Sequence, residues 1–166
     1  SIENASIINQ PFLFIQRGEC ILNIREVQRS DLLDLLTLYT ELHQNPIPED
    51  SASLRQVWEQ IIKDKNHHII VAVGEGKIVS SCVLVVIPNL THSQRPYALI
   101  ENVITSSRFR KRGLASACLS YARLIATKAG CYKIMLLTGS KQEDILHFYK
   151  SCGYNQNDKT AFIQWL

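Results

Sequence analysis

The chain reads Arg110-Lys111-Arg112-Gly113-Leu114-Ala115 at the point where a strand pattern gives way to a helix pattern. The preceding residues, 98–105, form an apolar run of the length of a strand. The apolar residues that follow have the spacing of a helix with one buried face, at positions 114, 117, 118, 121, 122 and 125. The first N–H groups of a helix have no carbonyl partner, and its dipole is positive there. This basic loop therefore predicts an anion-binding site.

The spacing within this loop narrows the ligand. Neither the dinucleotide pattern G-x-G-x-x-G nor the nucleotide loop G-x-x-x-x-G-K-[ST] is found here. The loop instead reads R-x-x-G-x-A, with Arg110, Gly113 and Ala115 at the fixed positions. It resembles the pyrophosphate loop of the GNAT superfamily of acyl-CoA-dependent N-acetyltransferases, which follows Q/R-x-x-G-x-G/A. Taken alone, the loop also fits a basic surface segment in front of an ordinary helix.

A second motif strengthens this resemblance. The segment Phe148-Tyr149-Lys150-Ser151-Cys152-Gly153-Tyr154 resembles the F-Y-x-x-x-G-F/Y element of the same family. One expected helix and one expected strand, at 133–138, separate the two motifs, which is the order that the family requires. The resemblance extends from about Ile21 to Leu166, and the chain is identified on these motifs as a member of the family.

The resemblance implies an α/β (α+β) GNAT fold, with a mixed, mostly antiparallel central sheet of about six to seven strands flanked by about four helices. We expect a single acetyltransferase domain over residues 21–166 and an N-terminal extension over residues 1–20. The apolar segment Phe12–Ile15 suits an extra edge strand or a dimer contact, and we expect a homodimer.

The hydrophobic pattern predicts the same order of elements. Strands are expected at 21–26, 69–73, 78–87, around Ile100, at 133–138 and at 161–166, and helices at about 30–43, 51–62, 114–129 and 143–151. The sequence Gly74-Glu75-Gly76-Lys77 predicts a hairpin between the second and third strands.

Composition fits one small domain. The 166 residues are 46% hydrophobic, and the formal net charge is only +3. Much of the local positive charge gathers at Arg108, Arg110, Lys111 and Arg112. Phe109 is the one aromatic residue among these cations, too few for a stacking surface, so a nucleic-acid partner is not expected and a small phosphate ligand is favoured.

Other features bear on location and metals. The sequence contains no apolar run long enough to span a membrane and no signal-peptide pattern, so neither a membrane nor secretion is expected. The five cysteines have no C-x-x-C spacing, which favours a reducing cytoplasm. Cys82 and Cys118 stand in apolar patterns and are expected in the core. The histidines lack a ligand spacing, so no metal is expected.

The reaction that the resemblance implies needs an acid and a base. An amine with a pKa of about 10.4 is protonated at neutral pH, so a base helps to free it for attack. A departing thiolate needs an acid. The family places the tyrosine that corresponds to Tyr149 near the cofactor sulfur, which makes Tyr149 the candidate acid. The alternative is that Tyr149 only packs its ring into the core.

Glu101 is the candidate base. It is the one carboxylate in the apolar strand before the loop, and many relatives carry a glutamate at this position. The alternative is a structural ion pair with His92, with Arg95 or with a residue across the sheet. By strand alternation, Asn102 is expected on the opposite face.

The resemblance also assigns the cofactor, acetyl-CoA, to this chain. The backbone of Val103, Ile104 and Thr105 is expected to pair with the pantetheine arm, and Gln142 is expected to hydrogen-bond it. The pyrophosphate is expected on Arg110, Lys111, Arg112, Gly113, Leu114 and Ala115. The family usually has a glycine where this chain has Lys111, and an asparagine where it has Gln142.

The expected function is therefore transfer of an acetyl group from acetyl-CoA to a primary amine of a small molecule or peptide, directly and in a ternary complex. A covalent route through Cys152 lacks a histidine placed by spacing to activate it. A catalytically silent CoA-binding sensor or partner-binding domain is the non-enzyme alternative. Acidic residues in the first helix pair, Glu41, Glu49 and Asp50, together with His43, are candidates to attract a cationic amine. Residues 130–134 and 148–153 also resemble glucosamine-phosphate acetyltransferases.

Overall fold

A computed structural model describes residues 12–15, 21–43 and 46–166 of the chain. Within these residues, six strands form one sheet in the order β1-β2-β3-β4-β5-β6. Neighbouring strands are antiparallel, except that β5 and β6 are parallel. The strands are β1 (Phe12–Ile15), β2 (Ile21–Glu26), β3 (His67–Gly74), β4 (Lys77–Ile87), β5 (Tyr97–Thr105) and β6 (Ile134–Leu136). The helices are α1 (Leu32–His43), α2 (Ala52–Lys63), α3 (Thr91–Gln94), α4 (Leu114–Lys128) and α5 (Glu143–Ser151), with 3-10 turns η1 (Arg29–Asp31) and η2 (Ser107–Phe109).

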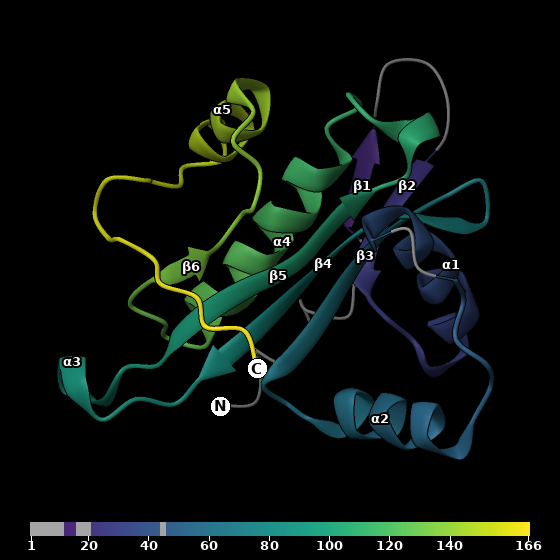
Figure 1. The fold of residues 1–166 in the computed structure, drawn as a ribbon, viewed down its shortest axis with the longest axis horizontal. Coiled ribbons are helices and arrows are strands. Elements are labelled where there is room, and N and C mark those ends of the chain that lie inside the picture. The colour runs from purple at the N-terminus through teal and green to yellow at the C-terminus, as the bar shows by residue number, and fades with distance from the viewer. Residues whose placement is uncertain (1–11, 16–20, 44–45) are drawn as a thin grey trace, which may run out of the picture.

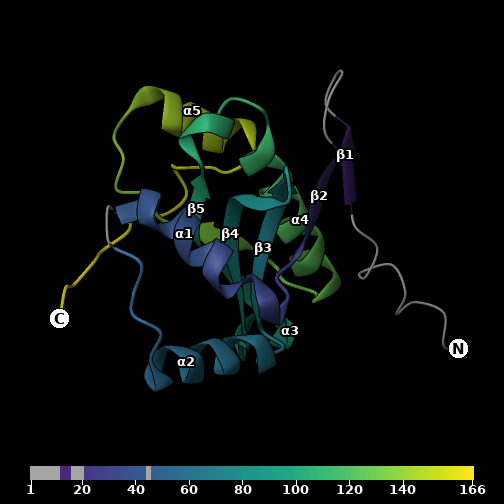
Figure 2. The same ribbon diagram turned by 90° about the vertical axis from the view of Figure 1, so that its right-hand side faces the viewer.

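The sheet separates two layers of helices (Figures 1 and 2). The apolar stripe of α4 packs against one face of β3, β4 and β5 and buries Leu114, Cys118 and Ala122. On the other face, Leu35 and Leu38 of α1 and Trp58 of α2 pack in a second cluster. The buried stripe of α4 is the one that the 3.6-residue periodicity predicts.

The hairpin between β3 and β4 forms where the sequence predicts it. Glu75 and Gly76 both have left-handed backbones, with φ of 54° and 74°. Two positive φ values in a two-residue loop match the right-handed twist of the flanking strands. This hairpin pairs β3 with β4, and the other edge of β4 pairs with β5.

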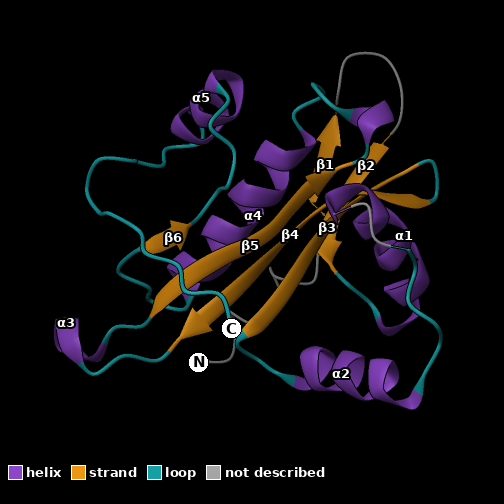
Figure 3. Cartoon of the chain, in the orientation of Figure 1, coloured by secondary structure: helices purple, strands orange, loops and turns teal. Residues whose placement is uncertain are grey.

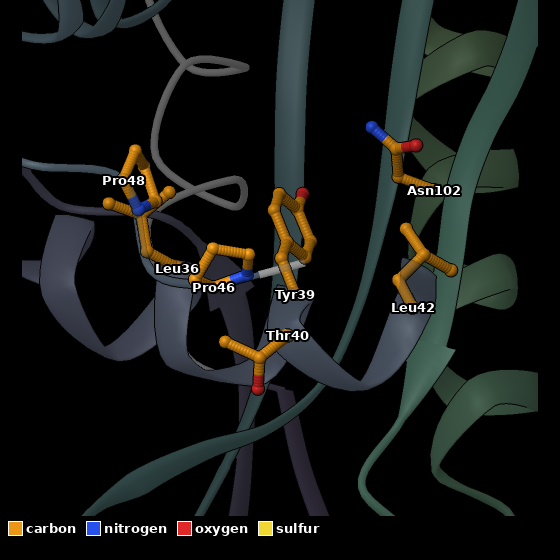
Figure 4. A pocket seen from close by; sticks show the side chains of 7 residues that line it. All are labelled: Leu36, Tyr39, Thr40, Leu42, Pro46, Pro48 and Asn102. Carbon is orange, nitrogen blue, oxygen red and sulfur yellow. The ribbon is translucent and has the colours of Figure 1, made fainter. Parts of the chain in front are cut away.

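A β-bulge interrupts the pairing of β4 with β5. Ser81 pairs with Ile104 and Val83 pairs with Glu101, so one extra residue is accommodated on β5. Asn102 within this bulge has a left-handed backbone, with φ of 50°. Simple alternation, which predicted opposite faces for Asn102 and Glu101, is wrong here, because Asn102 lies on the α1 side of the sheet (Figure 4).

The C-terminal part of the sheet differs from the sequence prediction. The strand β6 covers only Ile134–Leu136 of the predicted 133–138. Residues 161–166 are not a strand, and Phe162 and Trp165 are 91% and 88% exposed. Their β-rich composition predicted a strand, but a strand also needs a partner edge, and in the described residues they pair with none.

The fold class is the one expected: a mixed, mostly antiparallel sheet between helices. At the N-terminal side, β1 pairs with β2 at the sheet edge, and the rest of residues 1–20 lies outside the described residues. None of the helices in the described part of the chain is long and apolar enough to cross a membrane.

Candidate active site

The site begins where β5 and β6 part. β6 pairs with Ala98, Leu99 and Ile100 only, whereas β5 continues to Thr105 (Figure 3). From Glu101 to Thr105, β5 therefore has β4 on one side and no strand on the other among the described residues. An unpaired strand edge of this kind offers backbone N–H and C=O groups to an extended ligand.

Next to this edge lies the 110–115 loop, which leads into α4. Lys111 and Gly113 have left-handed backbones, with φ of 59° and 75°, and Gly113 is the N-cap of α4. The first helical bond runs from the Ala117 N–H to the Gly113 carbonyl at 3.0 Å. The preceding N–H groups of Leu114 and Ala115 have no such partner within the helix, so they are free to bind an anion.

The cations of the 110–115 loop are exposed. Arg112 stacks its guanidinium over the Phe109 ring, 5.0 Å from the centroid. Arg110 donates from Nε to the Thr105 carbonyl at 3.3 Å, which ties the loop to the end of β5. A dianionic ligand here would meet backbone donors, a helix N-terminus and positive charge together.

Glu41, near the end of α1, holds the chain just before this loop. Its carboxylate accepts from the Ser106 hydroxyl at 2.9 Å and from the Ser107 N–H at 2.8 Å. The Ser107 N–H, with the serine hydroxyls and nearby Arg110, lowers the pKa of Glu41 below 4.5. The carboxylate expected to attract an amine is thus committed to the loop. Asp50 is likewise paired, with Arg55, and the side chain of His43 lies outside the described residues.

Tyr149 lies on α5, packed against the core cluster on the α4 side. Its ring is 5.0 Å from that of Phe148 and 6.2 Å from that of Tyr154, centroid to centroid. Burial, with smaller effects of Cys152 and Cys82, raises the pKa of Tyr149 above 10. Because Cys82 is the β4 residue opposite the bulge, Tyr149 lies close to the point where β5 loses its second neighbour.

Glu101 lies on the opposite face from this cluster. It pairs with Val83, which belongs to the α1–α2 cluster, and paired residues of antiparallel strands share a face. Glu101 is exposed and makes no ion pair with any residue that the structure describes.

The ion-pair alternative for Glu101 is therefore wrong for the residues named for it. His92 stacks on Tyr132, with centroids 4.0 Å apart. Arg95 donates to the carbonyls of Gly130 and Cys131, each at 3.1 Å. Both candidates thus bind elsewhere, and Glu101 stays available at the bulge.

The sequence did not predict a groove that reaches Asn102, the chain neighbour of Glu101. This groove encloses about 230 Å³ between α1, the following loop and the β5 bulge (Figure 4). Its lining residues are Leu36, Tyr39, Thr40, Leu42, Pro46, Pro48 and Asn102. The helical pattern of α1 predicts a continuous apolar stripe, but it carries no signal that Leu36, Tyr39 and Leu42 border a groove instead of the closed core.

The remaining candidates have simple placements. Gln142 is the exposed N-cap residue of α5, so the side chain lies at the start of the helix that carries Tyr149. The Cys152 thiol points to the Ser116 hydroxyl, 3.6 Å away. Among residues 12–15, 21–43 and 46–166, no three His, Cys, Asp or Glu side chains gather in a way that would hold a metal ion.

Comparisons with known proteins agree with this geometry. The model of the Acetyltransferase (GNAT) family matches residues 32–154, so the chain belongs to the GNAT acetyltransferase family. It is 28% identical over 142 residues to the glucosamine 6-phosphate N-acetyltransferase of Trypanosoma brucei brucei, covering 83% of this chain and 92% of that protein. It is 36% identical to the solved "Putative acetyltransferase from Agrobacterium tumefaciens str. C58", with a TM-score of 0.79 and coverage of 86% and 99%.

A more distant structure shares the fold. The aminoglycoside N-acetyltransferase AAC(6')-Iy in complex with CoA is 16% identical, with a TM-score of 0.75 and coverage of 91% of this chain and 99% of that one.

Proposed function

We propose that this protein is an acetyl-CoA-dependent N-acetyltransferase that acetylates a primary amine by direct transfer in a ternary complex. The observation that carries the proposal is the junction at the β5 bulge. There, an unpaired strand edge, a basic helix N-terminus and an exposed carboxylate occur together. The name of the Trypanosoma relative, an N-acetyltransferase, supports an amine as the acceptor.

The residues fit acetyl-CoA in two places. The N–H groups at the start of α4, with Lys111 and Arg112, would bind the pyrophosphate. The free edge of β5, at Val103, Ile104 and Thr105, would pair with the amides of the pantetheine arm. When bound, the cosubstrate supplies the acetyl group as a thioester. The CoA complex of a protein with the same fold supports this assignment.

In the proposed chemistry, Glu101 accepts a proton from the acceptor ammonium, directly or through water. The nitrogen of the acceptor then carries the lone pair that attack requires. The C–N bond then forms at the acetyl carbonyl, and the C–S bond breaks with its electron pair on sulfur. Tyr149 donates its phenolic proton to that sulfur, and the second proton, which the nitrogen loses as the amide forms, returns to the Tyr149 oxygen through water. Burial raises the pKa of Tyr149, so the phenolic proton is present at neutral pH.

The experiment is a panel of alkylamines, amino acids, aminosugars and peptides, each incubated with acetyl-CoA. We expect amine-dependent release of free thiol, and mass spectrometry should show the N-acetyl product. The variant Glu101→Gln should lose the acidic limb of the pH–rate profile, whereas Tyr149→Phe should keep that limb. Tight CoA binding without thiol release on any amine would instead favour the non-catalytic sensor.

A further inference from the structure

We infer that the acceptor of this enzyme is a primary amine on an uncharged, largely apolar body, and that this body lies in the groove between α1 and Pro46–Pro48. This inference rests on the proposed function and adds the substrate class. It concerns the groove rather than the 110–115 loop, so it is tested separately from acetyl-CoA binding.

The position of the groove fits the acceptor. Asn102 forms one end of the lining and is the chain neighbour of Glu101. The bulge brings Asn102 to the α1 side, where Glu101 also lies, so an amine held at Glu101 has its body directed along the groove. Leu36, Tyr39 and Leu42 of α1 form its long wall (Figure 4).

The lining supplies no countercharge. The described side chains that line the groove are aliphatic, proline, aromatic, hydroxyl or amide, and none of them is charged. Removing a phosphate or carboxylate from water into such a lining is costly, because nothing there compensates the charge. An alkyl or aromatic body gains free energy in the same place, because apolar surface leaves water.

The polar atoms of the groove are neutral. Burial raises the pKa of Tyr39 to about 12, despite the Ser81 hydroxyl beside it, so Tyr39 stays a phenol at physiological pH. The hydroxyl oxygen of Tyr39 is buried, next to the Ser81 hydroxyl, so Tyr39 presents mainly its ring to the groove. A neutral phenol supplies no countercharge to an anionic group on the acceptor.

The charges around the groove favour the same class. Glu101 is the chain neighbour of Asn102, and Glu49 is exposed just after Pro48, so each acidic residue adjoins a residue that lines the groove. Arg110, whose positive charge acts on Glu41, is tied to the Thr105 carbonyl in the loop. An ammonium is therefore attracted to this region, and a phosphorylated acceptor is disfavoured. The prediction differs from the glucosamine 6-phosphate substrate in the name of the Trypanosoma relative.

The test compares phenethylamine with its para-carboxylated analogue and with glucosamine 6-phosphate. We expect kcat/KM for phenethylamine to exceed that of either anionic amine by at least about tenfold, since the groove does not compensate a buried charge. The variant Thr40→Lys places a cation in the lining and should shrink the preference over the carboxylated analogue severalfold. The matched control is Thr37→Lys, one turn earlier on α1 and outside the lining.

Calorimetry of the three amines on the protein–CoA complex separates the possible failures. If phenethylamine binds more tightly than the anionic amines but is not acetylated, the proposed function is contradicted. The inferred preference of the groove for an uncharged body would still hold. Acetylation with equal or better kcat/KM for the anionic amines would overturn the inference and leave the function standing. An unchanged preference in Thr40→Lys would place the acceptor outside the groove.

Discussion

Lys111 has a backbone conformation that side chains rarely adopt, with φ of 59°. Related loops usually have glycine at this place, and the left-handed backbone is the physical reason, since glycine has no Cβ to clash. The lysine costs some strain and adds a positive charge at the start of the anion site. Replacing Lys111 with glycine therefore tests both effects, the backbone strain and the added charge.

We predict that Lys111→Gly leaves the melting temperature unchanged or slightly higher, because relief of strain offsets the added freedom of the unfolded chain. Affinity for CoA should fall by up to about fivefold, the range of an exposed ionic contact, and should depend less on salt. The control is Glu75→Gly, which relieves a similar φ of 54° in the β3–β4 hairpin. A loss of CoA affinity as large in Glu75→Gly would show that the effect is not local to the loop.

The proposed acid role of Tyr149 depends on its phenolic hydroxyl alone. We predict that Tyr149→Phe lowers kcat by about 100-fold or more if chemistry limits turnover, with CoA affinity nearly unchanged because the ring still packs. The pKa of Tyr149 lies above 10, so the proton is present below that pH. The alkaline loss of activity due to Tyr149 should therefore lie at a higher pH than an unburied phenol would give.

The control is Tyr154→Phe, in the ring that meets Tyr149 edge-on. It should keep most of the activity. A wild-type kcat in Tyr149→Phe, with chemistry shown to limit turnover, would reduce Tyr149 to a packing residue.

Among the elements, α1 has two roles: it lines the groove, and through Glu41 it binds Ser106 and Ser107, just before the 110–115 loop. Because Glu41 accepts two hydrogen bonds from Ser106 and Ser107, Glu41→Ala should raise the KM for acetyl-CoA about two- to tenfold with little change in kcat. Glu41→Gln should recover part of the loss, since its amide oxygen can accept from the Ser107 N–H. The matched control on the same helix is Asp34→Ala, at an exposed position.

The pH dependence of this contact follows from its pKa. The folded-state pKa of Glu41 is lowered. The contribution of this contact to the free energy of unfolding is therefore complete above the ordinary value of 4.5, and it is lost as pH falls through the lower folded value.

The Glu41→Ala experiment has one contradicting outcome. A KM for acetyl-CoA that is equal or lower in this variant would mean that the carboxylate mainly repels the pyrophosphate.

The sequence predicted those elements whose signal is local. The stripe of α4, the Glu75-Gly76 turn and the loop before Leu114 all follow from residues close in the chain. The bulge could not be predicted, because it depends on the register between β4 and β5, and alternation then misplaced Asn102. The groove combines α1, a loop and β5, so only the assembled fold reveals it. The prediction of a strand at 161–166 was wrong, because amino-acid composition does not show whether a neighbouring strand edge is available for pairing.

At the scale of the whole molecule, we predict a homodimer. The edge strand β1 leaves one side of the sheet without a partner among the described residues, and the C-terminal segment exposes Phe162, Ile163 and Trp165. Exposed apolar groups of this size favour association. Light scattering at micromolar concentration should give twice the mass of one chain, and the mass of a single chain would contradict the prediction.

The central claim is that the start of α4 binds the pyrophosphate of acetyl-CoA, and calorimetry with CoA tests it most directly. Gly113→Asp places a carboxylate where the diphosphate would lie. Gly130→Asp is the matched control, because Gly130 has the same φ of 75° just beyond the other end of α4. The account predicts that Gly113→Asp weakens CoA binding at least about tenfold, since like charges repel at a helix N-terminus, while Gly130→Asp binds as the wild type does. Equal affinity for CoA in all three proteins would contradict the claim.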